Sequence, residues 1–300
     1  MLGCALGDAI GELAFSHRTR QSLKKAIQKI SVLPYTDDTA MAIALAESII
    51  RTGDINQQDI GDAFAENFYK EPWRGYASGP PTIFTLVKES KISYVEAAKT
   101  LFGGNGSFGN GAAMRIVPVG LHFYDSPDLY DKAAFSAEVT HAHPVGKDGA
   151  AIQALAIALA VKQTPGNSIN ISTYIGELIS KARTVEIKGK LQLVKSLLEK
   201  DVPPGEAIKK LGRSVAVHES MPFAIHSFLK YPQSFEECLM CAVLHGGDRD
   251  TLGAMAGSIC GAHLGIDHIP VEWLQKIENR EYLTGLANKL LDLRRRKKLP

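Results

Sequence analysis

Residues 37–52 read DDTAMAIALAESIIRT, and this stretch indicates the fold class of the whole chain. Met41, Leu45 and Ile49 recur four residues apart, which is the spacing of one face of an α-helix. The two carboxylates at the start of the stretch suit the positive end of a helix dipole. Residues 248–263 read DRDTLGAMAGSICGAH and follow the same pattern. The two stretches predict helices over 37–52 and 250–263, each beginning beside paired aspartates.

The rest of the chain has the same helical character, because no segment shows the period-two alternation of a half-buried strand. Ala- and Gly-rich stretches such as 150–156 and 253–257 let helices approach closely. We therefore predict an all-α fold, a single compact orthogonal helical bundle over residues 1–300, with a metal-containing cleft formed by helix N-termini and loops. A shortened helix before Gly7 is expected to depend on packing. The other predicted helices span 20–30, 57–70, 80–89, 93–101, 131–139, 146–163, 173–182, 190–199, 204–211, 216–229, 234–244, 270–276 and 281–296.

Composition is typical of a soluble enzyme, with 300 residues, 45% hydrophobic and 22% charged. The net charge of +2 does not favour nucleic acid or membrane partners, and the basic run 294–298 predicts a solvated end. We find no secretory signal and no apolar stretch of membrane-spanning length, so we expect a cytoplasmic protein. The four cysteines, including the Cys238 and Cys241 pair, are predicted to be buried thiols rather than disulfides or metal ligands.

The two aspartate pairs have two possible explanations. Thr and Asp are common N-cap residues, and for either pair alone helix capping is the more frequent explanation. However, two adjacent carboxylates carry more negative charge than one cap uses, and crowded carboxylates raise each other's pKa unless a cation offsets them. Oxygen donors are the ligands of Mg²⁺ and Mn²⁺, so the sequence favours a site for two such ions.

Five blocks, in order along nearly the full chain, resemble the ADP-ribosylglycohydrolases, which include the dinitrogenase reductase-activating glycohydrolases. The blocks are residues 7–11, 35–41, 106–115, 140–144 and 246–251. The resemblance implies that two Mg²⁺ or Mn²⁺ ions are held by Thr36, Asp37, Asp38, Asp248, Asp250 and Thr251. It further implies that Asp250 bridges the ions, whereas Arg249 points away from them or to solvent.

A Gly- and Asn-rich run, residues 104–111, is either an ordinary loop or a cradle for a phosphate or ribose. The resemblance favours the second explanation, because in the family this segment holds ADP-ribose. It implies that substrate is bound by Gly75, Ser107, Phe108, Gly109, Asn110 and His141. A lone His is more often structural, and only the block match assigns His141 a place beside the ribose. We expect His143, His245 and His263 to be structural.

One position departs from the family pattern. The family commonly has Glu where this chain has Phe15, near the metals and suited to acid–base catalysis. Glu12, one helical turn earlier, is the alternative general acid or base, although a solvated Glu12 is the simpler explanation. The resemblance then assigns Asp37, Asp38 and Glu12 as the catalytic residues.

These features predict a metal-dependent hydrolase that cleaves the linkage between C1″ of ADP-ribose and an acceptor. The substrate is expected to be an ADP-ribosylated protein, by resemblance at serine, or O-acetyl-ADP-ribose. Two alternatives stay open. One is a non-catalytic ADP-ribose-binding or structural, crystallin-like member, which Phe15 favours, and the other is an arginine-specific ADP-ribosyl-protein hydrolase.

Overall fold

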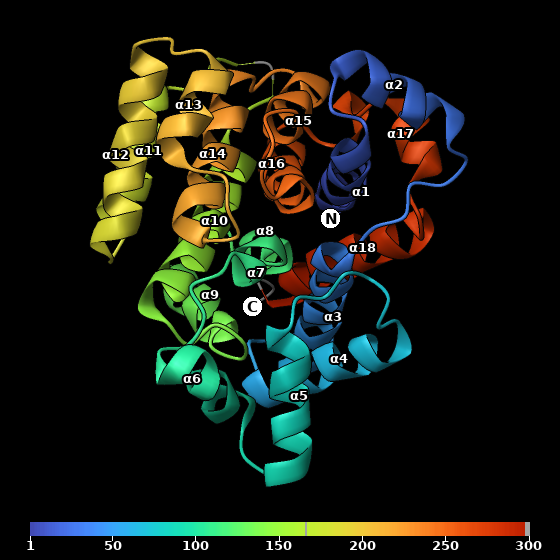
Figure 1. The fold of residues 1–300 in the computed structure, drawn as a ribbon, viewed down its shortest axis with the longest axis vertical. Coiled ribbons are helices and arrows are strands. Elements are labelled where there is room, and N and C mark those ends of the chain that lie inside the picture. Colours follow the sequence, from blue (N-terminus) through green and yellow to red (C-terminus); the bar gives the residue numbers. More distant parts are fainter. Residues whose placement is uncertain (166, 298–300) are drawn as a thin grey trace.

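Two helices that meet at their backbones lie at the centre of the fold, α1 (Leu2–Ser16) and α16 (Arg249–Leu264) (Figure 1). Each carries glycines four residues apart on the contacting face. A methyl group on Gly7 would lie 2.0 Å from the carbonyl oxygen of Gly253, and one on Gly257 would lie 2.2 Å from that of Gly3. Only glycine permits this approach. The crossing fixes the N-terminal helix against the start of α16, where the second aspartate pair lies.

The computed structural model describes residues 1–165 and 167–297. In this part of the chain all regular elements are helices, and the only bridges are the isolated pairs Leu33–Ile277 and Gly109–Ala216. The remaining helices are α2 (Arg20–Lys29), α3 (Asp37–Thr52), α4 (Gln57–Lys70), α5 (Gly79–Ser90), α6 (Tyr94–Gly104), α7 (Gly111–Met114), α8 (Val117–His122), α9 (Leu129–Ala137), α10 (Pro144–Lys162), α11 (Ile171–Lys181), α12 (Val185–Glu199), α13 (Pro204–Leu211), α14 (Val217–Lys230), α15 (Phe235–Val243), the 3₁₀ helix η1 (Ile266–His268), α17 (Val271–Lys276) and α18 (Arg280–Lys297).

The helices form two groups that meet around the short helices α7 and α8 (Figure 1). The group with α10 to α16 lies above and to the left in this view, and α3, α4 and α5 lie below. Helix α10 packs against α7, α8, α9, α14 and α16, so it runs through the core. The N-termini of α3, α7 and α16 converge between the two groups, which is where the cleft described below opens.

The all-α prediction is confirmed, and most predicted helices are present with ends shifted by one to three residues. The sequence missed α7 and α8, which are short and directly follow the Gly-rich run. It also began the 190–199 helix too late, because α12 starts at Val185. The first helix is longer than expected, since α1 starts at Leu2 and is buried almost all round. Its dependence on packing follows from that burial.

Two expectations from the sequence were wrong. The first was that no apolar stretch is long enough to span a membrane, because helix α10 is long and apolar enough by length and composition. However, 72% of its most apolar window is buried, as in a core helix of a soluble protein. The basic run 294–298 is not uniformly solvated, because Arg294 is buried over the Tyr124 ring and donates to Asp125 at 2.5 Å. Residue 298 lies outside the described residues. The four cysteines are free and buried, as predicted.

Candidate functional site

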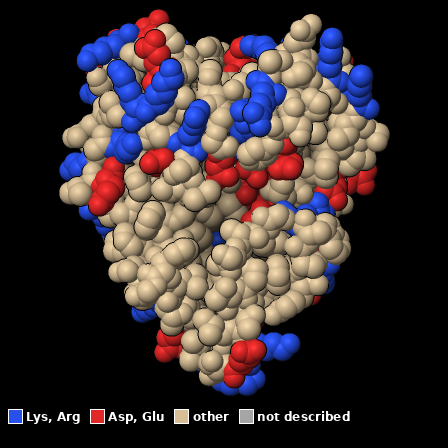
Figure 2. All heavy atoms as spheres, viewed as in Figure 1, with Lys and Arg blue, Asp and Glu red and all other residues tan. Residues whose placement is uncertain are grey.

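A cleft of about 520 Å³ opens where the N-termini of α3, α7 and α16 converge. Asp37 and Asp38 stand in the first turn of α3, Asp248 caps α16, and Asp250 stands in its first turn. Figure 2 shows acidic side chains gathered in a hollow at the middle of the molecule, with Lys and Arg directly above them. The lining includes Asp37, Asp38, Met41, Gly75, Ser107, Phe108, Gly109, Asn110, Gly111, Met114, Arg115, Thr140, His141, Val215, Asp248, Asp250 and Thr251.

Asp8, from the middle of α1, anchors the start of α3 behind this cleft. Its carboxylate is fully buried and accepts hydrogen bonds from both backbone N–H and hydroxyl groups of Thr36 and Thr39, at 2.6–3.1 Å. Burial nevertheless raises the pKa of Asp8 to about 6. The sequence analysis gave Asp8 no role, although its block, residues 7–11, was among those matched. The signal was an acidic residue in an otherwise apolar helix, which is rarely buried without partners.

The carboxylates at the cleft carry charge that the described residues do not neutralise. Burial, followed by the negative charge of Asp8, raises the pKa of Asp37 to about 7, and the same causes raise the pKa of Asp38. Burial and the neighbouring Asp248 raise the pKa of Asp250 to about 8. The positive charge of Arg115 acts in the opposite direction and lowers the pKa of Asp37, but it does not offset the other effects. Such crowding is the electrostatic condition that a bound cation relieves.

The hydrogen bonds of the cluster show which oxygens are free. Thr251 donates to Oδ1 of Asp38 at 3.4 Å, whereas the buried Oδ2 of Asp38 has no hydrogen-bond partner. Asn110 donates to Asp248 Oδ2 at 2.6 Å. The Thr36 hydroxyl donates to Asp8 at 2.8 Å, and Thr36 is not among the residues that line the cleft. A hydroxyl that donates keeps its lone pairs, so the role of Thr36 as a metal ligand stays a prediction. Asp38 therefore presents an unpaired oxygen at the place where a cation would need one.

The donor set fits a hard divalent cation, because the oxygens come from carboxylates and hydroxyls. Within residues 1–165 and 167–297, however, no three His, Cys, Asp or Glu side chains converge as a ready-made metal site. The aspartates are nevertheless close enough to raise each other's pKa.

The Gly-rich run forms one wall of the cleft and is held by backbone hydrogen bonds to the segment before α14. Asn110 N–H donates to the Val215 carbonyl at 2.8 Å, and Val217 N–H donates to that of Phe108 at 3.1 Å. Phe108 is 46% exposed, and its ring centroid lies 5.3 Å from that of His143 in an edge-to-face arrangement. His143, predicted to be structural, thus supports Phe108 as well as capping α10. The wall presents an aromatic face beside backbone N–H groups.

His141 lies buried at the back of the cleft, behind Gly109 and Gly111. Its Nδ1 is 2.7 Å from the Thr140 hydroxyl, which also accepts from the buried guanidinium of Arg115 at 2.7 Å. Burial, followed by the charge of Arg115, lowers the pKa of His141 to about 3. The imidazole is therefore neutral near pH 7 and can form hydrogen bonds without contributing charge. A methyl group on Gly111 would lie 2.9 Å from His141 Cε1, so the loop requires glycine there.

Gly75, predicted to bind substrate, lines the cleft, whereas its neighbours Arg74 and Tyr76 do not. Gly75 has φ +92°, and a methyl group on it would stand 3.7 Å from Asp37 Oδ1. Arg74 is instead buried and forms ion pairs with Glu71 and Glu278. Its carbonyl accepts from the Asp37 N–H at 2.8 Å, which fixes the start of α3.

The structure does not bring Glu12 or Phe15 into the cleft. Glu12 is exposed and does not line it, so its catalytic role stays a prediction. Phe15 is 38% exposed and lines a neighbouring pocket. Arg249 points away from the carboxylates as expected, but it is buried and donates to the Val243 carbonyl instead of reaching solvent.

Comparison with known proteins agrees with this geometry. The family profile described as ADP-ribosylglycohydrolase matches residues 1–300. The chain belongs to this family. It is 32% identical to the ADP-ribosylhydrolase ARH3 of Homo sapiens, over 97% of this chain and 91% of the relative. It is 30% identical to the ADP-ribosyl-(dinitrogen reductase) glycohydrolase of Rhodospirillum rubrum, over 92% and 88%.

The fold is also found among solved structures. A structure titled ADP-ribosylglycohydrolase-related protein complex superposes with a TM-score of 0.74, covering 98% of this chain and 95% of that one at 22% identity. This family membership implies glycohydrolase activity, and members of the family are generally metal-dependent. Family membership likewise implies substrates that contain ADP-ribose.

Proposed function

We propose that this protein is a metal-dependent hydrolase that cleaves the bond between C1″ of ADP-ribose and an acceptor and releases ADP-ribose. The observation that carries the proposal is the buried Asp38, whose Oδ2 has no hydrogen-bond partner. Asp38 lies among carboxylates that raise its pKa, and the Gly-rich run with Phe108 lines the same cleft. A structural protein has no use for uncompensated buried charge at a cleft. Family membership supplies the chemical class.

The residues divide into an acidic end and a binding wall. Asp37, Asp38, Asp248 and Asp250, with the hydroxyls of Thr36 and Thr251, would hold two Mg²⁺ or Mn²⁺ ions, and Asp250 would lie between them. When bound, such ions supply Lewis-acid polarisation and offset the negative charge of the cluster. Asp37 and Asp38 border the reacting end of the cleft, where one of them would accept the proton of the attacking water.

The wall would orient the ADP-ribose. Phe108, half-exposed and fixed by His143, offers a face on which a base or sugar stacks. Ser107, Gly109 and Asn110 line the cleft from the same loop, and Gly75 lines it beside Asp37. The neutral His141 would hydrogen-bond a ribose hydroxyl without adding a positive charge that would repel the bound ions.

For the acceptor, we propose a serine side chain of an ADP-ribosylated protein or the acetyl group of O-acetyl-ADP-ribose. Support comes from the blocks 35–41 and 106–111, which resemble that branch most closely, and from the 32% identity to ARH3. An arginine-linked acceptor and a non-catalytic ADP-ribose-binding role are the alternatives. The second of these is favoured by Phe15, which puts an aromatic ring where the family commonly has a carboxylate.

The test is release of free ADP-ribose from a serine-ADP-ribosylated peptide and from O-acetyl-ADP-ribose, with Mg²⁺ and after EDTA, beside an ADP-ribose binding titration. We expect Mg²⁺-dependent release, and its loss in Asp38→Asn but not in Asp131→Asn. Asp131 is a matched control because its side chain is exposed and pairs only with Arg183 at the surface. Tight ADP-ribose binding without release from either substrate would refute the proposal and leave the arginine-linked substrate and the non-catalytic role to be distinguished.

A further inference from the structure

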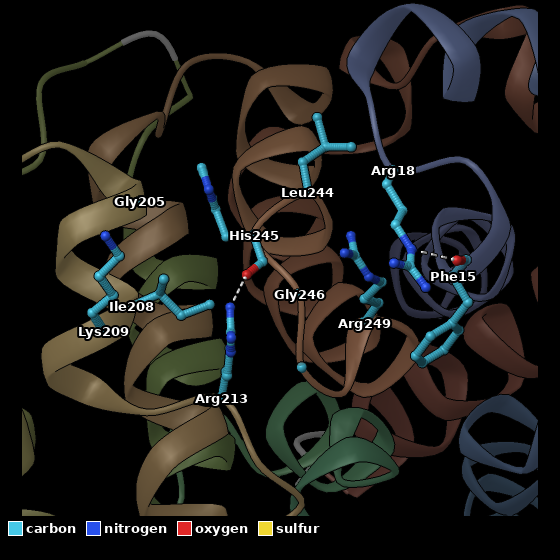
Figure 3. Close-up of a pocket in the computed structure, with 11 residues that line it drawn as sticks. Phe15, Arg18, Gly205, Ile208, Lys209, Arg213, Leu244, His245, Gly246 and Arg249 are labelled. Atoms are coloured by element: carbon cyan, nitrogen blue, oxygen red, sulfur yellow. Dashed lines mark hydrogen bonds between the residues drawn. The ribbon is translucent and has the colours of Figure 1, made fainter.

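A second pocket, of about 630 Å³, lies beside the cleft and is lined by basic side chains (Figure 3). Arg18 comes from the segment between α1 and α2, Lys209 from α13, Arg213 from the segment before α14, and Arg249 from α16. His245 and Phe15 complete its polar and aromatic walls. No Asp or Glu contributes to the lining, so its charged side chains are all basic.

The four cations have no carboxylate partner in the part of the chain that the structure describes. Arg18 Nε donates to the Phe15 carbonyl at 3.2 Å, Arg213 Nη1 donates to that of His245 at 2.7 Å, and Arg249 donates to that of Val243. Other surface arginines are paired, such as Arg20 with Glu236 and Glu237. Backbone carbonyls leave the positive charge of the pocket uncompensated.

The guanidinium groups also crowd one another. A methyl group on Gly246 would lie 3.0 Å from Arg213 Nη1 and 3.7 Å from Arg249 Nη2, so both guanidinium groups lie beside the same glycine. The turn that holds them depends on glycine, because Gly247 has φ +80° and a methyl group there would lie 2.1 Å from the Arg213 carbonyl. Repulsion among fixed like charges is the condition that a multivalent anion relieves.

The pocket and the cleft share their dividing wall. Gly246, Gly247 and Arg249 face the pocket, whereas Asp248, Asp250 and Thr251, from the same turn, face the cleft. On α1, Phe15 at the pocket follows Asp8 at the carboxylate cluster by seven residues, or about 10 Å of helix. The Gly-rich run with Phe108 lines the cleft and not this pocket. A group bound in the pocket would therefore lie on the other side of the turn 246–251 from the cleft.

We propose that this basic pocket binds a phosphate-bearing group on the acceptor side of the substrate. The acceptor assignment rests on the proposed function, whereas the affinity of the pocket for phosphate does not. Phosphate carries charge and acceptor oxygens enough to bridge several of the four cations. The group could be the pyrophosphate of a further ADP-ribose unit or a phosphorylated residue of an acceptor peptide.

The direct test is a calorimetric titration with inorganic pyrophosphate while saturating ADP-ribose fills the cleft. We expect one pyrophosphate per chain, bound about tenfold more weakly by the double variant Arg18→Gln/Lys209→Gln, since two exposed charge contacts are lost. Both side chains are exposed, so the variant should fold. Lys25→Gln/Lys188→Gln removes the same charge elsewhere and should bind as the unchanged protein does, and Arg18→Lys/Lys209→Arg should restore binding.

Kinetics then identify the source of the phosphate. For an ADP-ribose chain, or for a serine-ADP-ribosylated peptide that carries a neighbouring phosphoserine, the double variant should raise KM about tenfold with kcat unchanged. The substrate whose KM rises in the double variant identifies the source of the phosphate. The KM for O-acetyl-ADP-ribose should not change. Absence of pyrophosphate binding beside bound ADP-ribose, or equal binding by the double variant, would overturn the proposal. A protein that binds pyrophosphate here but releases no ADP-ribose would refute the hydrolase and leave the phosphate pocket standing.

Discussion

Replacing Asp250 with Asn should have opposite effects on stability in the absence and presence of metal. Asp250 ordinarily titrates near pH 3.8, but burial and the neighbouring Asp248 raise its pKa to about 8 in the folded chain. Between these values the folded state binds more protons than the unfolded state, so the stability of the metal-free protein falls as pH rises. Asn carries no titrating charge, so the variant should lose less stability over the same range.

The magnitude follows from the pKa shift. Between about pH 6.5 and about pH 8.5, unfolded Asp is fully ionised while folded Asp250 only gradually loses its proton, which costs the wild-type chain about 2 kcal/mol. Unfolding 300 residues changes the entropy by about 0.6 kcal/mol per kelvin, so the Tm difference between variant and wild type should widen by about 3 °C. Comparing the two proteins cancels the titration of groups away from this cluster.

The measurement is thermal unfolding of both proteins at the two pH values, first in EDTA and then with Mg²⁺. With Mg²⁺ at about 100 times its Kd, the wild type should gain about 2.7 kcal/mol, or about 4 °C, while the variant gains little. The same Tm difference at both pH values in EDTA would show that Asp250 is not held protonated by its neighbours. Equal stabilisation of both proteins by Mg²⁺ would refute the assignment of Asp250 between two ions.

Three further predictions concern the wall and the core. Phe108→Ala should weaken ADP-ribose binding about tenfold in a titration with no change in Tm, because the exposed ring offers an area on which a base or sugar stacks. The control is Phe135→Ala, an equally exposed phenylalanine on α9, which should bind ADP-ribose normally. Equal losses of affinity in both variants would contradict the role of Phe108. Gly111→Ala should lower the Tm by about 2–5 °C in a melting experiment, because the added methyl group meets His141. Gly189→Ala, in open space on α12, should raise the Tm slightly, and a melt of Gly111→Ala as stable as the wild type would refute the steric argument. The four buried cysteines should not react with a thiol reagent until the chain unfolds, and rapid labelling of the folded protein would contradict their burial.

The sequence determined the features that local periodicity encodes. Spacings of three and four residues between apolar side chains predicted α3 and α16, and the aspartates at their starts were recognised as candidate ligands. The Gly-rich run was likewise identified from its composition. These predictions succeeded because helix formation and capping depend on residues within a turn or two of each other. Short helices were missed, because α7 has only 4 residues and shows no periodicity of apolar side chains.

Assembly of the site could not be predicted in the same way, because it depends on residues far apart in the chain. Asp8 accepts hydrogen bonds from Thr36 and Thr39, which lie 28 and 31 residues further along the chain. Helices α1 and α16 come from opposite ends of the chain and meet at their backbones because Gly7 and Gly253 lack side chains. Each of these helices carries glycines four residues apart, but this repeat does not identify which helix is the partner.

The chemistry of individual side chains was also decided by tertiary contacts. The sequence showed a lone His141, and burial beside Arg115 lowers its pKa to about 3, which keeps the ring neutral well below its ordinary pKa of 6.5. It showed Arg249 between two aspartates, and only the turn of α16 directs those aspartates into the cleft while Arg249 joins Arg213 in a second pocket. Charge and protonation depend on the solvent and neighbours that surround a group in space. The sequence by itself therefore determined which helices form and where their carboxylates begin, whereas the packing of those helices decided which carboxylates share one cleft.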